Sequence, residues 1–328
     1  MNLRIRRRRF GQIAIISAAL SAIANFAGKT VAQQSGSIIY GVSLTSTSSI
    51  INIGIKIAGL IDINISPGVT LISSDLVSGR DLATIQIAGI SLNNLDTLVE
   101  TASKALYTEP SERLTALTPL ADGSLLIASV ASTRTGNVNR IILTDAAKSS
   151  RPLKALRVSG FRRVNGTLES LVAIKENNFL GVVSLNEGTP PFDLVNFDLN
   201  SAKLNYSDDL PLLAANLRLS NLAQAPDGTI YATTLSSQGG TTLVQLDLEN
   251  KAIVSGRGKI IRLSELKYND KPLENDLLSL AVDRSGQVFA LANPTNEETN
   301  SLFNVDVKSG EMNFVRKFAA DKIAFPRV

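Results

Sequence analysis

Short apolar segments separated by polar turns recur along the chain, and one arrangement of them occurs four times. Each copy has an apolar lead-in, a tight turn, a short strand that ends in small residues, a polar loop, and a second strand that closes on Asp. The closing aspartates are Asp145, Asp198, Asp247 and Asp306, at spacings of 53, 49 and 59 residues. This pattern predicts repeated units of three or four strands each.

In each copy a two-residue turn joins the lead-in to the first strand. The turn is Asp-Gly in two copies, Asn-Asn in one and Ser-Gly in one. They occupy residues 114–117 with 122–128, 168–173 with 177–182, 219–223 with 227–232, and 277–282 with 285–290. A short sheet of this kind cannot bury its apolar faces alone. Packing several sheets radially lets each one cover the next, which is the β-propeller arrangement.

Over residues 112–318 these units resemble the blades of NHL-type and quinoprotein-type propellers. The resemblance implies an all-β fold, a β-propeller with five or six blades, of the kind found in exported bacterial proteins. It brings no functional motif with it, and the Gly-His and Trp-Asp signatures of WD-repeat blades are absent. A β-sandwich or a parallel β-helix remains an alternative.

The segment 33–111 fits the repeat less well. Residues 38–43 match the second strand of a blade, Ile51 to Ile57 are predicted to be its third strand, and Val69 to Ser73 its fourth. The first strand is expected from the C-terminal residues Lys322 to Phe325, which would latch the ring. Residues Asn93 to Leu106 place their apolar side chains on one helical face and predict a helix or an inserted element.

Residues 1–32 have the order of a secretory signal peptide. Residues 4–9 are basic, Ile13 to Ala27 are apolar, and Thr30 to Ala32 resemble a cleavage site. Arg7, Arg8 and Phe10 match part of the twin-arginine export motif, although Gly11 and Gln12 depart from it. We therefore expect export by a cleavable signal peptide to the bacterial periplasm or outside the cell, with residues 33–328 as one propeller domain. An uncleaved anchor helix and the general secretory route are the alternatives.

The composition excludes several kinds of catalytic and metal site, because the chain has no His, no Cys and no Trp. A Ser-His-Asp triad is excluded, as are zinc, haem and iron–sulfur sites with their usual ligands. Lectin activity is disfavoured without Trp. Residues 1–32 hold six of the 33 basic residues and no acidic one, so 27 basic residues face 29 acidic ones in the mature chain. That balance argues against nucleic acid as a partner.

Several motifs that could carry chemistry have simpler structural explanations. The four closing aspartates precede polar turns and are expected to form Asx turns, and Asp122 and Asp227 stand in tight turns. Ser264 and Lys267 match a Ser-x-x-Lys pattern at a frequency expected by chance. The oxygen-rich segment 269–276 lacks the spacing of a calcium loop and is expected to be a solvated loop. No cofactor is predicted, and calcium is the one metal left open.

One charge feature stands out between Asp145 and Glu169, where there is no acidic residue and six basic ones. We name these the basic strip: Lys148, Arg151, Lys154, Arg157, Arg162 and Arg163. In the repeat register they occupy the outermost strand of a blade and the link to the next. A charged edge protected from aggregation is one explanation. A docking surface for an anionic partner is the other.

Two functional classes fit these observations. The favoured hypothesis is a non-catalytic binding or scaffold propeller of the bacterial envelope that recognises a protein or polymer partner. The alternative is a calcium-dependent hydrolase or lactonase that resembles gluconolactonase-type propellers. That class needs several carboxylates converging at the channel mouth, and their spacing in the sequence gives no such set.

Overall fold

The computed structural model describes most of residues 35–328, which form one compact unit. The described residues are 38–44, 55–57, 61–63, 69–87, 112–133, 136–145, 154–175, 178–186, 188–207, 210, 213, 215–235, 240–248, 259–274 and 276–327. The predicted signal peptide and the predicted helix at 93–106 lie outside them. In the described part of the chain, no helix is long and apolar enough to cross a membrane.

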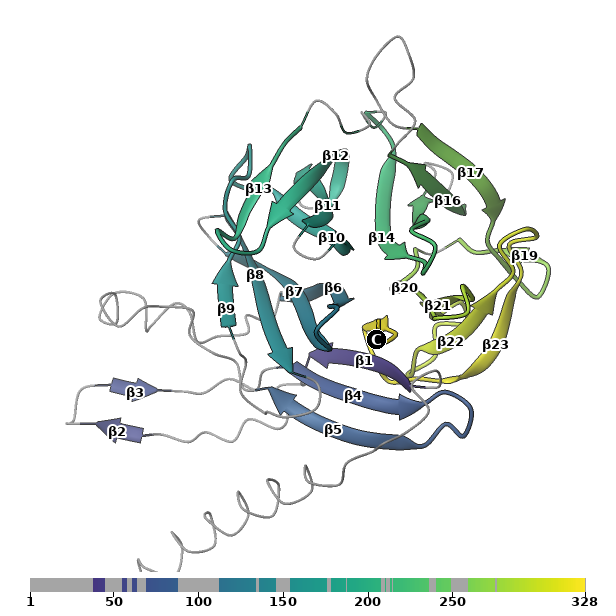
Figure 1. Cartoon of the computed structure of the whole chain (residues 1–328), viewed down its shortest axis with the longest axis horizontal. Coiled ribbons are helices and arrows are strands. Elements are labelled where there is room, and N and C mark those ends of the chain that lie inside the picture. The colour runs from purple at the N-terminus through teal and green to yellow at the C-terminus, as the bar shows by residue number, and fades with distance from the viewer. Residues whose placement is uncertain are drawn as a thin grey trace, which may run out of the picture. The chain divides into compact units, whose positions relative to one another are not determined.

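The structure is a five-bladed β-propeller, with five four-stranded antiparallel sheets arranged around a common centre (Figure 1). Blade 2 consists of β6 (Arg113–Pro119), β7 (Ser124–Thr133), β8 (Gly136–Asp145) and β9 (Lys154–Arg157). Blade 3 consists of β10 (Thr167–Lys175), β11 (Asn178–Asn186), β12 (Thr189–Asp198) and β13 (Lys203–Asn205). Blade 4 consists of β14 (Arg218–Gln224), β15 (Ile230–Leu235), β16 (Thr241–Asp247) and β17 (Lys259–Glu265). Blade 5 consists of β20 (Ser279–Val282), β21 (Val288–Ala292), β22 (Ser301–Val305) and β23 (Met312–Lys317).

Blade 1 is built from both ends of the propeller, as the sequence predicts. Its strand order is β24 (Lys322–Ala324), β1 (Ile38–Leu44), β4 (Val69–Asp75) and β5 (Asp81–Ile87). The C-terminal strand pairs antiparallel with β1, where Gly41 faces Ile323. Each inner strand contacts the inner strand of the next blade, and β20 contacts β24, so this latch closes the ring.

The strand order predicted for blade 1 was wrong in one respect. Residues 55–57 form β2 (Ile55–Ile57), which pairs with β3 (Ile61–Ile63) as a separate two-stranded ribbon. The third strand is β4, which was expected to be the fourth, and β5 takes the outer position. A second two-stranded ribbon joins blades 4 and 5, formed by β18 (Lys267–Tyr268) and β19 (Lys271–Pro272).

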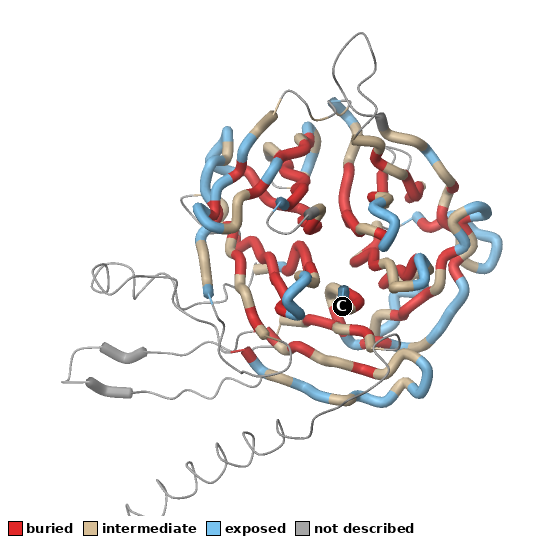
Figure 2. The backbone as a smooth tube through the Cα atoms, viewed as in Figure 1, coloured by how far each residue is buried: buried red, intermediate tan, exposed pale blue. Residues whose placement is uncertain are grey.

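Apolar side chains fill the five spaces between neighbouring blades, one hydrophobic cluster to each space. Figure 2 shows that the buried residues follow the inner strands and that exposure increases toward the outer edge. Polar bonds join the inner strands as well. Thr118 Oγ1 donates to the Leu171 carbonyl at 2.7 Å, and the Leu222 N–H donates to Ser170 Oγ at 2.8 Å. Radial packing therefore provides the burial that a single sheet lacks.

Candidate functional site

Each inner strand begins at one end of the centre of the ring and finishes at the other. We call the centre of the ring the central channel and its two ends the mouths. The turn-side mouth is where β6, β10, β14, β20 and β24 finish. The charged mouth is where the same strands begin, at Arg113, Glu169, Arg218, Asp276 and Lys322. Both mouths therefore draw on all five blades.

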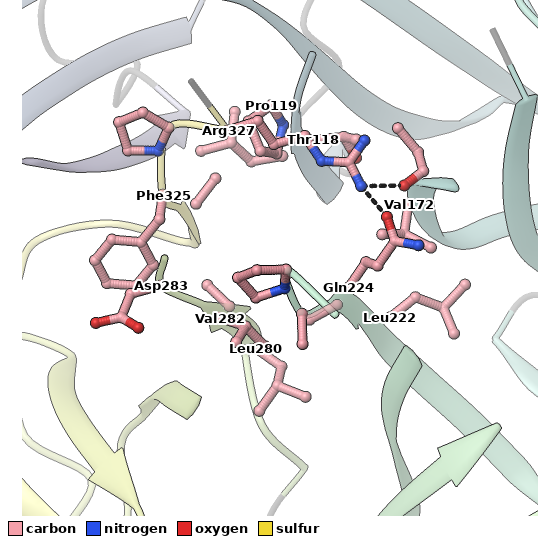
Figure 3. A pocket seen from close by; sticks show the side chains of 18 of the residues that line it. Thr118, Pro119, Val172, Leu222, Gln224, Leu280, Val282, Asp283, Phe325 and Arg327 are labelled. Atoms are coloured by element: carbon pink, nitrogen blue, oxygen red, sulfur yellow. Dashed lines mark hydrogen bonds between the residues drawn. The ribbon is translucent and has the colours of Figure 1, made fainter. Parts of the chain in front are cut away.

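The turn-side mouth holds a pocket of about 600 Å³ (Figure 3). Its walls are mainly apolar, and every inner strand contributes to them. One apolar lining residue from each inner strand is Leu117, Val172, Leu222, Leu280 and Ala324. The polar side chains of the lining are fewer, and they include Gln224, Asp227, Asp283, Arg284 and Arg327.

Tight turns hold the carboxylates around this mouth. The Thr229 N–H donates to Asp227 Oδ1 at 2.9 Å, and the Ser285 N–H donates to Asp283 Oδ1 at 2.8 Å. Gly228, the residue after Asp227, has a φ of +90°, which favours glycine. Hydrogen bonds from Thr229 lower the pKa of Asp227. This carboxylate is therefore ionised at neutral pH and has no proton to donate as a general acid.

The C-terminal residues form one wall of the pocket. Phe325 is buried, and its ring lies 4.9 Å from that of Phe289. Arg327 reaches across the mouth, where its guanidinium donates to the Ala173 carbonyl at 2.5 Å and to Gln224 Oε1 (Figure 3). Burial lowers the pKa of Arg327. The residue that follows the latch strand thus bonds to blades 3 and 4 across the channel.

At the charged mouth, four of the five charged side chains form two ion pairs between neighbouring blades. Arg113 Nη2 lies 2.7 Å from both carboxylate oxygens of Glu169, and Arg218 Nη2 lies 3.3 Å from Asp276 Oδ2. The pairing register of β10 shifts between Leu168 and Ser170, which makes Glu169 the extra residue of a β-bulge. Bulges change the direction of a side chain, and this one brings the carboxylate to Arg113.

Lys322 is the fifth charged residue, and it is half-buried at the beginning of the latch strand. Its ammonium donates to the Leu278 carbonyl, and among the described residues no carboxylate forms an ion pair with it. Burial lowers the pKa of Lys322 to about 8, against the opposing effect of Asp276. Burial also raises the pKa of Asp276, against the opposing effect of Arg218. Perturbed groups that cluster in this way are common at functional sites.

The basic strip is only partly described, since Lys148 and Arg151 lie outside the described residues. Lys154 and Arg157 are exposed on β9, the outermost strand of blade 2, as the repeat register predicts. Arg162 forms an ion pair with Asp193 at 3.6 Å, and its guanidinium lies 4.1 Å from the ring centre of Tyr206. Arg163 is exposed. The strip therefore runs along a blade edge and onto the link to blade 3.

The closing aspartates and the oxygen-rich segment 269–276 lie in different parts of the structure. Asx turns are confirmed at Asp198, which accepts from the Asn200 N–H at 3.0 Å, and at Asp306, which accepts from the Lys308 N–H at 2.8 Å. The segment 269–276 divides, because Asn269 and Asp270 form an exposed turn whereas Asp276 belongs to the charged mouth. Among the described residues, no group of three carboxylates lies close enough together to hold a metal ion.

The charged mouth was not predicted, although the sequence carries a signal for it. Arg113, Arg218, Asp276 and Lys322 each directly precede the apolar lead-in of a blade, and Glu169 follows the first apolar residue of one. A charged residue at the same position of each repeat lies at the same end of the channel. The pocket at the other mouth has no such signal, because Arg327 follows the last strand and belongs to no repeat.

Comparison with known proteins identifies no family for this chain. No family model and no curated protein matches the chain. Among solved structures, the chain is 12% identical to a hydrazine synthase of Kuenenia stuttgartiensis, over 73% of this chain and 57% of that one, with a TM-score of 0.37. It thus spans little more than half of that protein.

Two further structures have similar values. The β-propeller domain of Cps50 (Swd1) from Myceliophteria thermophila is 11% identical, over 80% of this chain and 84% of that one, with a TM-score of 0.36. Regucalcin from Agrobacterium tumefaciens, a calcium-binding protein, is 13% identical, over 76% and 67%, with a TM-score of 0.34. The propeller fold of this chain is established by its own strand pairing.

Proposed function

We propose that this protein is a non-catalytic binding propeller of the bacterial envelope that holds a compact, largely apolar ligand group in the pocket at its turn-side mouth. The group belongs to a small molecule or to a side chain of a protein or polymer partner. The main observation that supports this proposal is the pocket, which has a volume of about 600 Å³ and is lined by all five inner strands.

The size and lining of the pocket support this function. Sites for small ligands usually have volumes of roughly 300–1,000 Å³, with apolar walls and a few placed polar groups. Here Val172, Leu222 and Leu280 provide apolar contact, and Gln224 and Arg327 provide hydrogen-bonding groups (Figure 3). A ligand with an apolar body and one acceptor atom matches these walls.

A binding role accords with the state of the nearby carboxylates. Asp227 and Asp283 already accept hydrogen bonds from backbone N–H groups of their own turns. A general base or acid works best with a pKa near the working pH, and the pKa of Asp227 is lowered from its usual value. We therefore assign these carboxylates to turn formation.

Export to the envelope is the second part of the proposal, and it rests on the first 32 residues. If the twin-arginine route is used, replacing Arg7 and Arg8 with Lys will leave the precursor in the cytoplasm. Normal export of that variant would point to the general secretory route. The basic strip is the surface we propose for the first contact with an anionic partner, because Lys154, Arg157 and Arg163 are exposed there.

The test is native mass spectrometry on protein purified from the envelope of its own host. The wild-type protein should carry an added mass, and Ile174→Trp, which fills the pocket wall, should lose it. The matched control is Ile261→Trp on the outer strand β17, where Ile261 is also partly exposed, and it should retain the mass. Retention by Ile174→Trp would contradict the proposed site.

A second readout separates binding from catalysis. The released ligand is incubated with fresh protein, with and without calcium, and its mass is followed over time. An unchanged mass supports a binding role. A calcium-dependent change in mass would instead identify the hydrolase or lactonase that was the alternative hypothesis.

A further inference from the structure

The charged mouth has more hydrogen-bond donors than acceptors, even though its formal charges nearly balance. Glu169 Oε1 accepts from Arg113, Thr167 and Ser184, and its Oε2 accepts from Arg113. Asp276 shares the one hydroxyl proton of Ser220 between its two oxygens, and its Oδ2 forms the ion pair with Arg218. Asp321, the remaining carboxylate near Lys322, accepts from the Leu44 N–H at 3.1 Å. Each of the three carboxylates therefore already accepts at least one hydrogen bond.

The three cations have N–H groups beyond those that their described ion pairs and hydrogen bonds use. A guanidinium has five N–H groups and an ammonium has three. Arg113 and Arg218 each use one terminal nitrogen for their ion pairs, and their side chains are 46% and 38% exposed. Among the described residues, Lys322 donates one hydrogen bond, to the Leu278 carbonyl. A ligand that brings acceptor atoms and negative charge would complete this set.

Lys322 is the centre of the arrangement. It lies on the inner latch strand, and its ammonium is close enough to Arg113 and Asp276 for their charges to act on it. Asp276 in turn connects it to Arg218. The three cations come from the beginnings of the inner strands of blades 1, 2 and 4, so they lie at the same end of the ring.

We propose that the charged mouth is a second binding site, which takes an oxyanion group, a carboxylate or a phosphate, against Lys322 with Arg113 and Arg218 as further donors. Bidentate recognition of such groups is the usual role of arginine, and lysine provides a compact positive charge. The site lies at the opposite end of the channel from the pocket, so it does not depend on the proposed function.

Protonation of Lys322 supplies an independent readout. Its pKa in the free protein is about 8, and the charged groups around it are Asp276, Arg113, Glu169 and Asp321. An oxyanion binds the protonated ammonium, so binding should weaken as the pH rises above 8. Between pH 8 and pH 9.5 the affinity for a fully ionised anion should fall by roughly 20-fold. The arginines stay protonated over that range.

The experiment is calorimetric titration of the purified mature protein with inorganic phosphate and, separately, with succinate. Saturable binding of either probe to the wild type is expected, and the tighter of the two identifies the source of the oxyanion. Lys322→Met should weaken binding at least tenfold, whereas Lys267→Met, on the β18–β19 ribbon, should have no effect. Circular dichroism verifies that each variant is folded.

If Lys322→Met does not fold, the pH series on the wild type takes its place. Absence of binding of both probes at 10 mM would overturn the proposal. So would binding that does not weaken between pH 8 and pH 9.5, or a folded Lys322→Met with unchanged affinity. Ile174→Trp should bind the probes normally, which separates this site from the turn-side pocket.

Discussion

The two mouths of the channel are formed by the same five strands, yet they differ in the chemistry that holds them together. At the charged mouth, ion pairs such as Arg113–Glu169 join neighbouring blades. At the turn-side mouth the walls are mainly apolar, and Arg327, which follows the latch strand of blade 1, bonds to blades 3 and 4, which are not neighbours of blade 1. Between the blades the interior is mainly apolar, with a few hydrogen bonds between inner strands.

The packing that stabilises the propeller and the chemistry of its two mouths therefore depend on different residues. Burial between the sheets stabilises the ring, so the ends of the inner strands are free to vary. Residues at the strand beginnings bring charge to one mouth. Residues at the strand ends lead into tight turns such as Asp227-Gly228, which leave space for a pocket. Each mouth can therefore be altered without rebuilding the core.

The largest effect should come from removing the latch strand, which contributes to both mouths. A chain that ends after Asp321 lacks the buried residues Ile323, Ala324 and Phe325 and the inner strand of blade 1. We expect a loss of about 5 kcal/mol or more in the free energy of unfolding, because each large apolar side chain contributes about 1.5–3 kcal/mol. Urea unfolding measures it. A chain that ends after Pro326 is the control, and equal midpoints for the two truncations would disprove the latch.

The next largest effect concerns the apolar wall of the turn-side mouth. Phe325→Ala removes a ring that is 4% exposed and packed on Phe289, so we expect a cost of about 3–5 kcal/mol. The matched control is Phe314→Ala on the outer strand β23, where the ring is 51% exposed and should cost about 1 kcal/mol. Thermal unfolding compares them. Equal losses would mean that the tail residue does not support the pocket.

The pH dependence of stability distinguishes the charged mouth. The pKa of Lys322 is lowered from 10.5 to about 8 in the folded protein. Below pH 8 both states hold the proton, so Lys322 adds no slope. Between pH 8 and 10.5 the unfolded state binds more protons, so the free energy of unfolding should rise with pH, by up to about 1.4 kcal/mol per pH unit. Lys322→Met should lack this rise relative to wild type in urea melts at pH 7.5, 9 and 10. Parallel curves would contradict the burial of this ammonium.

The smallest effect is expected at the ion pairs. Arg113→Met leaves Glu169, which is 6% exposed, without its cation and should cost about 1–2 kcal/mol, because Arg113 itself is 46% exposed and screened by solvent. Arg162→Met breaks the exposed pair with Asp193 and should cost about 0.5 kcal/mol or less. Chemical unfolding of both variants tests the contrast. A cost for Arg162→Met that equals or exceeds that of Arg113→Met would count against it.

The repeat pattern predicted the blades and the latch because both depend on local alternation and turn residues. The Asp-Gly turns and the closing aspartates Asp198 and Asp306 have the geometry that their sequence indicates. Blade 1 was harder, since residues 51–57 and 69–73 are both apolar and alternating. Alternation identifies a strand but not its partner, and in the structure β1 pairs with β4.

The sites were less accessible from the sequence because they depend on ring closure. Arg113 and Glu169 are 56 positions apart, and they meet only because equivalent positions of neighbouring blades face the same mouth. Arg327 bonds to Ala173 and Gln224 at distances of 154 and 103 positions. Neither contact follows from local periodicity, whereas the recurrence of a charged residue at each lead-in was available as a signal.

Methyl-labelled NMR can report whether the turn-side mouth holds a ligand group. Labelled Leu, Val and Ile residues line the pocket at Val172, Ile174, Leu222, Leu280 and Val282. Adding the small-molecule fraction of an envelope extract should shift these methyl signals saturably and leave the outer-strand residues Ile261 and Val315 unchanged. Shifts confined to outer-strand methyls, with the pocket signals unmoved, would contradict the claim.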